Sequence, residues 1–394
     1  MGRDLKGKDL GKGISQRRDG RYQARFTNRF GERPTVYGNT LKEVKNLLHQ
    51  AIIADIREEN VKDSKLTLDE WSEKWLRIYK KPTIKEVTYV KYQNLYRTMI
   101  KPYLGKYKLT SITNLMVADY LSQLSDEYST GTLKFIRGIL SNIFKYAVKN
   151  NLCSINPTEG IALKKNSKKI VVLKMQDQLD FLEYSKDDYY CNAYKVLLNT
   201  GMRIGELAAL TIEDIDLKNN VINVNKTMAY YQKKSCKYNF HVTTPKTKAS
   251  IRQIPINAIC WDAIKNQIER NKNLPDAQIK NYNNLLFPTK SNAPLSQPSF
   301  SYHIKKIIKA INADREKKGM QLLPNFNSHT FRHTFATRCF EVGIQPKTVQ
   351  DYLGHSSIQM TLDIYTEVLI EKKFEDIKKL ECIDGKKDSS IQAA

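Results

Sequence analysis

The start of the chain alternates short strand-like runs with one helical run. Apolar and polar residues alternate in GISQRR, RYQARFTN and PTVYGN, and Asp19-Gly20 between the first two is a strong signal for a two-residue hairpin turn. Thr40 and Glu43 then form a capping box, and apolar residues from Leu41 to Ile52 follow at helical spacing. The pattern predicts a three-stranded antiparallel sheet with one helix packed on it.

The middle of the chain has a wholly helical pattern. Apolar stripes with a period of about 3.6 residues occupy four segments, 66–80, 86–104, 113–124 and 130–151. They predict a compact helical bundle. The lysine-rich stretch LKKNSKKI follows, and because it has no large apolar cluster before its end, it indicates a flexible basic linker.

Beyond the linker the pattern alternates helix and strand. Helices are predicted at about 189–199, 257–270, 297–313, 329–342 and 345–353, with a hairpin-rich region at about 221–256. The final stretch GKKDSSIQAA has the composition of a disordered tail. The predicted fold class is therefore multidomain: an N-terminal three-stranded β-sheet plus helix, an all-α helical domain, and an α+β, mainly helical domain with a small antiparallel sheet.

The charge of the chain indicates its partner. The 394 residues carry a formal net charge of +24, and residues 1–33 alone hold ten Lys and Arg against four Asp and Glu. Such a field attracts polyanions, so nucleic acid is the expected partner. A solvated charged face is the alternative for the sheet, and ordinary packing is the alternative for the tyrosines of KYQNLYR. The candidate DNA contacts are Arg17, Arg18, Arg21, Arg25, Lys91, Arg97, Lys164 and Lys165.

The sequence disfavours membrane binding and a structural zinc site. No run of about 18 apolar residues could span a bilayer, and the N-terminus MGRDLKGKDLGKG lacks the apolar core of a secretory signal. A cytoplasmic protein is therefore expected. The six cysteines lie far apart without C-x-x-C spacing, which indicates reduced residues rather than zinc ligands.

Two segments of the last domain place cations in turns. In LLNTGMRIGELAAL one helix ends and another starts just after Arg203, and Glu206 is close enough to hold the guanidinium. In HVTTPKTKASIRQIPI, Lys246 and Lys248 are predicted in a tight turn between two strands, from which an ammonium group can reach a phosphate ester. An ordinary surface ion pair and a solubilising hairpin tip are the alternatives.

The segment SHTFRHTFAT carries a second arginine. Ser328 is the expected N-cap, which puts His329 and Arg332 on one face near the electropositive end of a helix, where a phosphate is favoured. His333 raises zinc binding as an alternative. Thr330 disfavours it, because a hydrolytic zinc helix needs glutamate at that position.

A tyrosine lies ten residues after another histidine. In DYLGHSSIQMTLDIYTEV, His355 follows a glycine that closes a short helix, and Tyr365 comes later. Two guanidiniums, an ammonium and an imidazole can stabilise a pentacoordinate phosphate, and such a pocket can activate a phenol whose ordinary pKa is about 10. No D-x-D cluster marks a two-metal nuclease, and Asp9 occupies the P-loop hydroxyl position, so no cofactor is expected. The residues indicate phosphodiester transfer through a covalent tyrosine.

The residues just described closely resemble the tyrosine recombinase (phage integrase) family, most like integrases of conjugative transposons and temperate phages of low-GC bacteria. The resemblance covers about residues 170–381 and rests on Arg203, Lys246, His329, Arg332, His355 and Tyr365 in that order. It implies that the two arginines clamp the phosphate, that Lys246 is the general acid, and that Tyr365 is the nucleophile. It also implies phosphate-contacting or acid/base roles for both histidines, with Glu206 in support. Lys248 is the alternative acid, and the sequence leaves open how Lys246 and His329 divide the proton transfers.

The resemblance also assigns a function and partners. It implies an integrase that moves a mobile genetic element through a 3′-phosphotyrosine and a Holliday junction, acting on double-stranded DNA with core and arm sites. A homotetramer joined through the C-terminal tail helix, an excisionase and a host bending protein are further implied partners. Packing of the tail helix within its own subunit is the alternative. A type IB topoisomerase and a non-catalytic DNA-binding regulator are the alternatives. The implied parts are 1–62 (arm-type DNA-binding), 63–162 (SAM-like core-binding), 163–172 (linker), 173–382 (catalytic domain with tail helix) and 383–394 (disordered tail).

Overall fold

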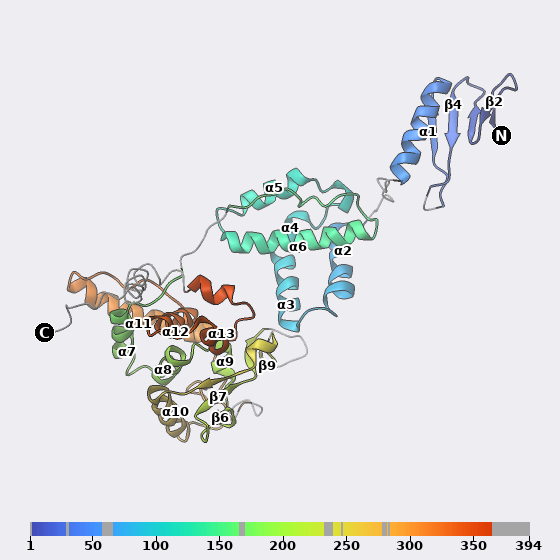
Figure 1. Ribbon diagram of the computed structural model, residues 1–394. Coiled ribbons are helices and arrows are strands. Elements are labelled where there is room, and N and C mark those ends of the chain that lie inside the picture. Colours follow the sequence, from blue (N-terminus) through green and yellow to red (C-terminus); the bar gives the residue numbers. More distant parts are fainter. Residues whose placement is uncertain are drawn as a thin grey trace, which may run out of the picture. The chain divides into compact units, whose positions relative to one another are not determined.

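Two compact units make up the chain, residues 1–167 and 168–394 (Figure 1). The computed structural model describes residues 2–28, 31–56, 66–164, 170–231, 239–245, 247–277, 282 and 284–364. Lys165, Lys246 and Tyr365 lie outside the described residues, as do the predicted tail helix and the predicted disordered tail. In the described part of the chain, no helix combines the length and the apolar character that crossing a membrane requires.

The first unit begins with the predicted sheet and helix. The elements are β1 (Gly2–Arg3), β2 (Asp9–Gly11), β3 (Ile14–Gln16), β4 (Tyr22–Arg25), β5 (Thr35–Gly38) and α1 (Leu41–Ile56). β3, β4 and β5 form a three-stranded antiparallel sheet in that order, while β1 and β2 form a hairpin that the pattern did not predict. The turn between β3 and β4 has three residues rather than two, because the Arg17 N–H donates to the Arg21 carbonyl at 2.8 Å across it.

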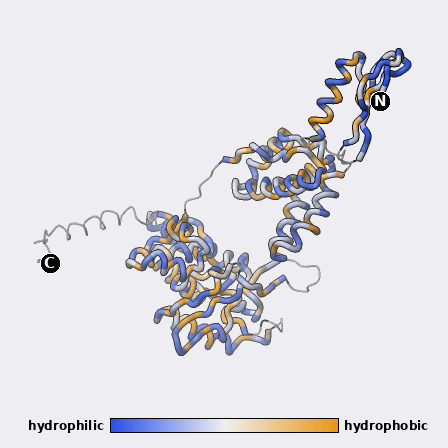
Figure 2. The backbone as a smooth tube through the Cα atoms, turned by 45° about the vertical axis from the view of Figure 1, so that its right-hand side comes forward, coloured by the Kyte–Doolittle hydropathy of each residue, from blue (hydrophilic) through white to orange (hydrophobic). Residues whose placement is uncertain are grey.

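The helix α1 covers one face of this sheet. Thr40 Oγ1 accepts a hydrogen bond from the Glu43 N–H at 3.2 Å, and the Glu43 carboxylate accepts one at 2.8 Å from Asn39 rather than from Thr40. The second hydrogen bond of the capping box therefore comes from the residue before the expected one. Val44 is fully buried against Ala24 of β4, and Figure 2 shows hydrophobic positions recurring along α1.

The predicted helical bundle forms the rest of the first unit. Its elements are α2 (Leu68–Trp75), η1 (Leu76–Lys80), α3 (Glu86–Leu95), η2 (Tyr96–Ile100), α4 (Lys101–Leu104), η3 (Leu109–Ser111), α5 (Asn114–Gln123) and α6 (Thr130–Lys149). The side chains of Thr67, Thr113 and Ser129 cap α2, α5 and α6, so each helix begins where a short polar residue offers an acceptor. The π-helical turns η1 and η2 interrupt the first two predicted helices.

The second unit is mainly helical. Its helices are α7 (Met175–Tyr184), α8 (Cys191–Thr200), α9 (Ile204–Ala209), α10 (Ala258–Asn271), α11 (Gln297–Lys317), α12 (Ser328–Glu341) and α13 (Pro346–Leu353). The helices predicted between residues 189 and 353 are present, and α7 is an additional one. Arg315 of α11 holds α7 in place, because its Nη2 donates to Asp177 at 2.8 Å and to Asp180 at 2.6 Å.

Two small antiparallel sheets complete the second unit. The strands are β6 (Ile215–Asp216), β7 (Val221–Val224), β8 (Thr227–Tyr230), β9 (Phe240–Thr243) and β10 (Arg252–Pro255). One sheet has the order β10-β7-β6 and the other pairs β8 with β9. Lys248 lies in a turn between two strands, as predicted, but β9 and β10 pair with different partners, so the two strands do not form a hairpin. Residues 244–251, including the short turn η5 (Lys248–Ser250), connect the two sheets.

Four separate hydrophobic cores stabilise the described residues. The N-terminal sheet and α1 enclose a small one around Ile14, and the helical bundle encloses another around Trp75. The largest surrounds Tyr194 of α8 in the second unit. A smaller cluster between α12 and α13 contains Leu353 and Ile364. No side chain belongs to more than one of these cores.

Candidate active site

Arg203 lies at the turn between α8 and α9. α8 ends at Gly201, whose φ of 61° lies in the left-handed region, and Arg203 precedes α9 with an extended backbone. Glu206 accepts hydrogen bonds from the Arg203 N–H at 2.9 Å and from its Nη1 at 2.8 Å. Because Glu206 is only 3% exposed, it is a fixed carboxylate that holds the more exposed guanidinium.

A second guanidinium binds the same carboxylate, and the sequence reasoning missed it. Arg252 of β10 donates from Nη1 and Nη2 to the two oxygens of Glu206, at 3.2 and 3.0 Å. Burial would raise the pKa of Glu206, but the charges and hydrogen bonds of Arg252 and Arg203 outweigh it and hold that pKa below its ordinary value. The sequence did offer a signal for Arg252, because an arginine lies at the start of the strand-like run IRQIPI, directly after the segment that carries Lys246 and Lys248.

Arg332 is the most deeply buried cation of the site. It is 1% exposed, and it donates from Nη1 to the Gly201 carbonyl at 2.8 Å and from Nη2 to the Leu353 carbonyl at 2.6 Å. Burial, followed by the nearby charge of Arg203, lowers the pKa of Arg332 to about 9, which leaves it charged at neutral pH. The guanidinium thus joins the turn before α9 to the end of α13.

The start of α12 differs from the sequence prediction. The N-cap is Asn327 and not Ser328, because the Asn327 side-chain oxygen accepts a hydrogen bond from the His329 N–H at 2.8 Å while Ser328 is already the first helical residue. The rings of His329 and His333 meet edge to face, with centroids 4.7 Å apart. Partial desolvation, then the charges of Arg332 and Arg203, lower the pKa of His329.

His355 follows the end of α13 and is 6% exposed. Its Nδ1 shares a hydrogen bond of 2.9 Å with the hydroxyl of Thr361. Burial, and after it the charges of Arg332 and Arg203, lower the pKa of His355 to about 3. The ring is therefore neutral at physiological pH and acts as a hydrogen-bonding group rather than as a cation.

We expect the His355 ring to remain neutral as the pH falls from 8 to well below 6. The folded-state pKa of about 3 lies below the ordinary histidine value of about 6.5. As the pH falls, the unfolded chain therefore binds the proton before the folded protein does. His355 does not lower the free energy of unfolding above about pH 6.5, but it lowers it progressively as the pH falls from there toward 3. Histidine-selective NMR titration measures this directly. A His355 resonance with a midpoint near the ordinary value would contradict it.

A pocket of about 460 Å³ opens beside Arg203. Pro245 and Thr247, the sequence neighbours of Lys246, line it together with Gly354. The segment that carries Lys246 therefore borders the same pocket as Arg203 and the residue before His355. Ile364, the last described residue, is buried in the cluster between α12 and α13, so the chain that leads to Tyr365 is anchored beside the helix of Arg332.

Gly354 brings the end of α13 against the connection between the two sheets. Its φ is 64°, and a Cβ there would lie 2.8 Å from the Ala249 carbonyl oxygen. Gly354→Ala should lower the free energy of unfolding by about 2–4 kcal/mol, since both a left-handed backbone and an overpacked contact are unfavourable. Gly343→Ala is the matched control, because Gly343 has a φ of 84° with open space around it. Urea unfolding measures both variants, and equal losses would contradict the role of the contact.

The predicted DNA-contacting residues that the structure describes are all on the surface. Arg17, Arg18, Arg21, Arg25, Lys91, Arg97 and Lys164 are exposed. Arg17 lies over the ring of Tyr37, 5.5 Å from its centroid, and Arg25 donates to Thr35 Oγ1 at 3.0 Å. Tyr96 of the segment KYQNLYR is buried in the helical bundle, so ordinary packing rather than DNA contact explains this tyrosine.

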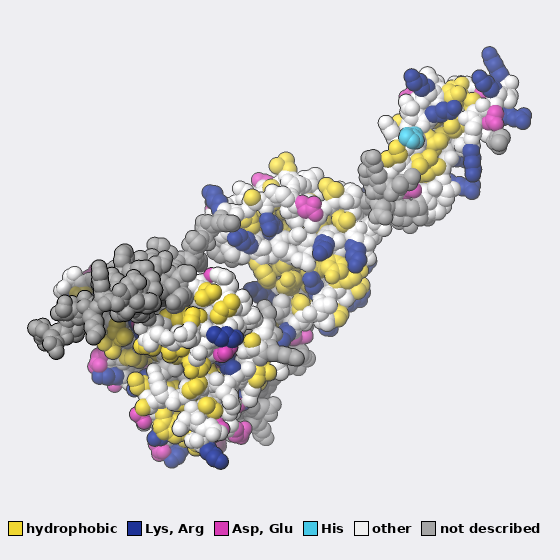
Figure 3. Space-filling view, in the orientation of Figure 1, with side chains coloured by type: hydrophobic (Ala, Val, Ile, Leu, Met, Phe, Trp, Pro, Cys, Tyr) yellow, Lys and Arg dark blue, Asp and Glu magenta, His cyan; other side chains and the backbone are white. Residues whose placement is uncertain are grey.

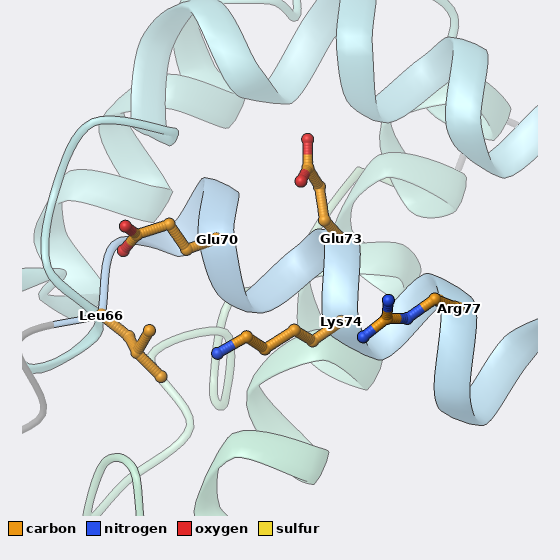
Figure 4. Close-up of a pocket in the computed structure, with 5 residues that line it drawn as sticks. All are labelled: Leu66, Glu70, Glu73, Lys74 and Arg77. Carbon is orange, nitrogen blue, oxygen red and sulfur yellow. The ribbon is translucent and has the colours of Figure 1, made fainter.

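A second hollow lies on the helical bundle. A hollow of about 410 Å³ on the helical bundle is lined by Leu66, Glu70, Glu73, Lys74 and Arg77, and its charged side chains all come from α2 and η1 (Figure 4). Glu70 is occupied in the capping box of α2. Within the described ranges, no cluster of three or more His, Cys, Asp or Glu residues could hold a metal ion.

Three family models match successive parts of the chain. The phage integrase family matches residues 172–372, the N-terminal SAM-like domain of phage integrases matches 67–125, and the DNA binding domain of the Tn916 integrase matches 1–60. The transposase from transposon Tn916 of Enterococcus faecalis is 27% identical over 406 residues, which is 96% of each chain. The Tn1549 transposon integrase in complex with a circular intermediate DNA is 25% identical, with a TM-score of 0.68 over 80% of this chain and 100% of that one. A lambda integrase tetramer bound to a Holliday junction shares the fold, at 20% identity and a TM-score of 0.55 over 91% of this chain and 95% of that one.

These matches define the class, and the chain belongs to the phage integrase family. Within the family it is a site-specific tyrosine recombinase of the conjugative-transposon type, an enzyme that integrates and excises a transposon. The resemblance inferred from the sequence is thus confirmed. The topoisomerase and regulator alternatives are not favoured.

Proposed function

We propose that this recombinase cleaves DNA with Tyr365 as the nucleophile, in a pocket where Arg203, Arg332 and His355 bind the scissile phosphate. The observation that supports this proposal is the convergence of three separate elements. The start of α9, the buried face of α12 and the turn after α13 bring these side chains within electrostatic reach of one another. The segment that carries Lys246 borders the same pocket.

The proposed chemistry is a two-step phosphoryl transfer. The Tyr365 oxygen forms a bond to phosphorus while the bond to the 5′ oxygen breaks. His329 accepts the phenolic proton, and Lys246 donates a proton to the leaving oxygen. Arg203 and Arg332 stabilise the charge on the nonbridging oxygens, and neutral His355 contributes a hydrogen bond. In the second step a 5′ hydroxyl of the partner duplex attacks the 3′-phosphotyrosine and gives its proton to Lys246, while the tyrosine leaves and regains its proton from His329. Lys248 remains the alternative acid.

We assign the sheet face opposite α1 to DNA binding. Ala24 faces the core, and since successive side chains of a strand alternate, Gln23 and Arg25 face away from α1. Arg17 over Tyr37 adds a second cation to that exposed face. Figure 3 shows Lys and Arg side chains spread over this part of the chain. A basic sheet face of this kind can enter a DNA groove and bind phosphates.

The remaining assignments extend this proposal to the rest of the chain. Residues 1–62 bind arm-type sites, 63–162 bind the core site together with the catalytic domain 173–382, and 163–172 connect them. The enzyme acts on double-stranded DNA as a homotetramer whose tail helices link neighbouring subunits. An excisionase and a host bending protein set the direction of the reaction, in the cytoplasm.

Trapping of the covalent intermediate tests the proposed chemistry. Full-length protein is incubated with transposon-end DNA that carries a nick beside the cleavage point, so that the short 5′-hydroxyl fragment diffuses away and religation is prevented. We expect a protein–DNA adduct that is stable to denaturant, with the nucleotide attached to the peptide that contains Tyr365 in mass spectrometry. Absence of an adduct, or attachment at another residue, would overturn the proposal.

A further inference from the structure

Arg252 joins three segments that carry proposed catalytic residues. Besides its two bonds to Glu206, its Nε donates to the Tyr352 carbonyl near the end of α13, and its Nη1 donates to the Ser250 carbonyl at 3.2 Å. One planar group thus contacts the carboxylate that holds Arg203, the turn before His355, and the connection that contains Lys246. Its side chain is 5% exposed, and each of its three nitrogens already donates a hydrogen bond to one of these groups.

We propose that Arg252 is a positioning residue for strand cleavage, which fixes Glu206 and the end of α13 so that Arg203 and His355 contact the same phosphate. This inference rests on the proposed function of those two residues. A lysine at this position keeps the charge but has one nitrogen. A single ammonium nitrogen cannot donate to Glu206 and to the Tyr352 carbonyl with the geometry of the planar guanidinium, whose several nitrogens point in different directions.

The buried carboxylate gives this role a distinctive pH dependence. Three guanidiniums face Glu206, those of Arg203 at the start of α9, Arg252 on β10 and Arg332 on α12. Removing Arg252 takes away the two largest influences that lower the pKa of Glu206, its charge and its hydrogen bonds, so the pKa of this buried carboxyl rises. Protonated Glu206 would no longer hold Arg203 by an ion pair. Loss of Arg252 should therefore add an acid limb to the cleavage rate that the wild-type enzyme lacks.

Single-turnover cleavage of the nicked transposon-end DNA, measured from pH 5 to 8.5, tests the proposal. Arg252→Met should slow adduct formation ~10- to 100-fold at alkaline pH, the usual effect of removing a residue that orients a catalytic group, and more as the pH falls. Arg252→Lys should be slower than wild type but should keep the wild-type pH profile, because its charge keeps Glu206 ionised. DNA affinity, measured by gel shift, should stay unchanged in both variants.

Arg315→Met is the matched control. Arg315 is also a buried arginine bonded to carboxylates in the same unit, but it contacts Asp177 and Asp180 on α7 and no proposed site residue. It should lose stability without gaining an acid limb.

An Arg252→Met enzyme with the wild-type rate, or with a loss that is equal at every pH, would overturn the proposal. If Arg252→Met does not fold, Arg252→Lys decides, since a wild-type rate in that variant would also overturn it. Absence of an adduct with the wild-type enzyme would instead contradict the proposed function itself.

Discussion

Replacing Tyr365 by phenylalanine is expected to abolish the covalent adduct, with a loss of at least about 10⁴-fold, the scale seen when a nucleophile is removed. The phenyl ring keeps the shape of the side chain and removes only the oxygen that bonds to phosphorus. DNA affinity should stay within about twofold, because phosphate contacts by many cations dominate binding. Denaturing gels of nicked-substrate reactions measure the adduct, and gel shifts at fixed salt measure affinity.

The matched control for this substitution is Tyr352→Phe. Tyr352 lies on α13, close in sequence to the site, and its backbone carbonyl, which Arg252 uses, is unaffected by the change. We expect this variant to form the adduct at the wild-type rate. If Tyr365→Phe still became attached to DNA, the nucleophile would have to be another residue.

Arg332→Lys is expected to slow cleavage by about 10³-fold, because removing a charged donor from a phosphoryl-transfer site has effects of this size. It should also lower the free energy of unfolding by about 1–3 kcal/mol, since a single ammonium cannot satisfy both the Gly201 and the Leu353 carbonyls. Single-turnover cleavage and urea unfolding measure the two effects separately.

Arg338→Lys on the same helix separates catalysis from stability. Arg338 also donates to a backbone carbonyl, that of Leu173 at 2.6 Å, and it binds Glu341. Its substitution should lower stability without a comparable loss of cleavage. If both variants lost cleavage in proportion to their stability, Arg332 would have only a structural role.

Local patterns predicted much of the fold. Alternating residues located β3, β4 and β5, and the stripes of period 3.6 located the four helical stretches of the bundle and the helices of the second unit, since burial of one face imposes those periods. α7 was missed because Phe181 is its one buried residue and two ion pairs, of Arg315 with Asp177 and with Asp180, also hold it. The pairing of β10 with β7 was missed because β8 and β9 intervene between these two strands in the sequence.

The proposed site was predictable only where a family pattern named its members. Arg203 and Arg332 lie 129 positions apart in the sequence, and no local rule brings their guanidiniums together. Their environment was not predictable either. Arg332 is almost fully buried and His355 is neutral because α8, α12 and α13 pack around them. Arg252 was missed because its partners, Glu206 and Tyr352, come from other elements.

The four separate hydrophobic cores have a consequence for how such genes diversify. Because the core around Ile14 shares no side chain with the cores around Trp75 and Tyr194, each part derives its folding free energy from its own residues. A crossover between two related genes within the codons between α1 and α2 would give a hybrid protein whose parts still fold. Under the proposed assignment of residues 1–62 to arm-type sites, such a crossover would change which arm sites are bound without changing the residues that cut the DNA.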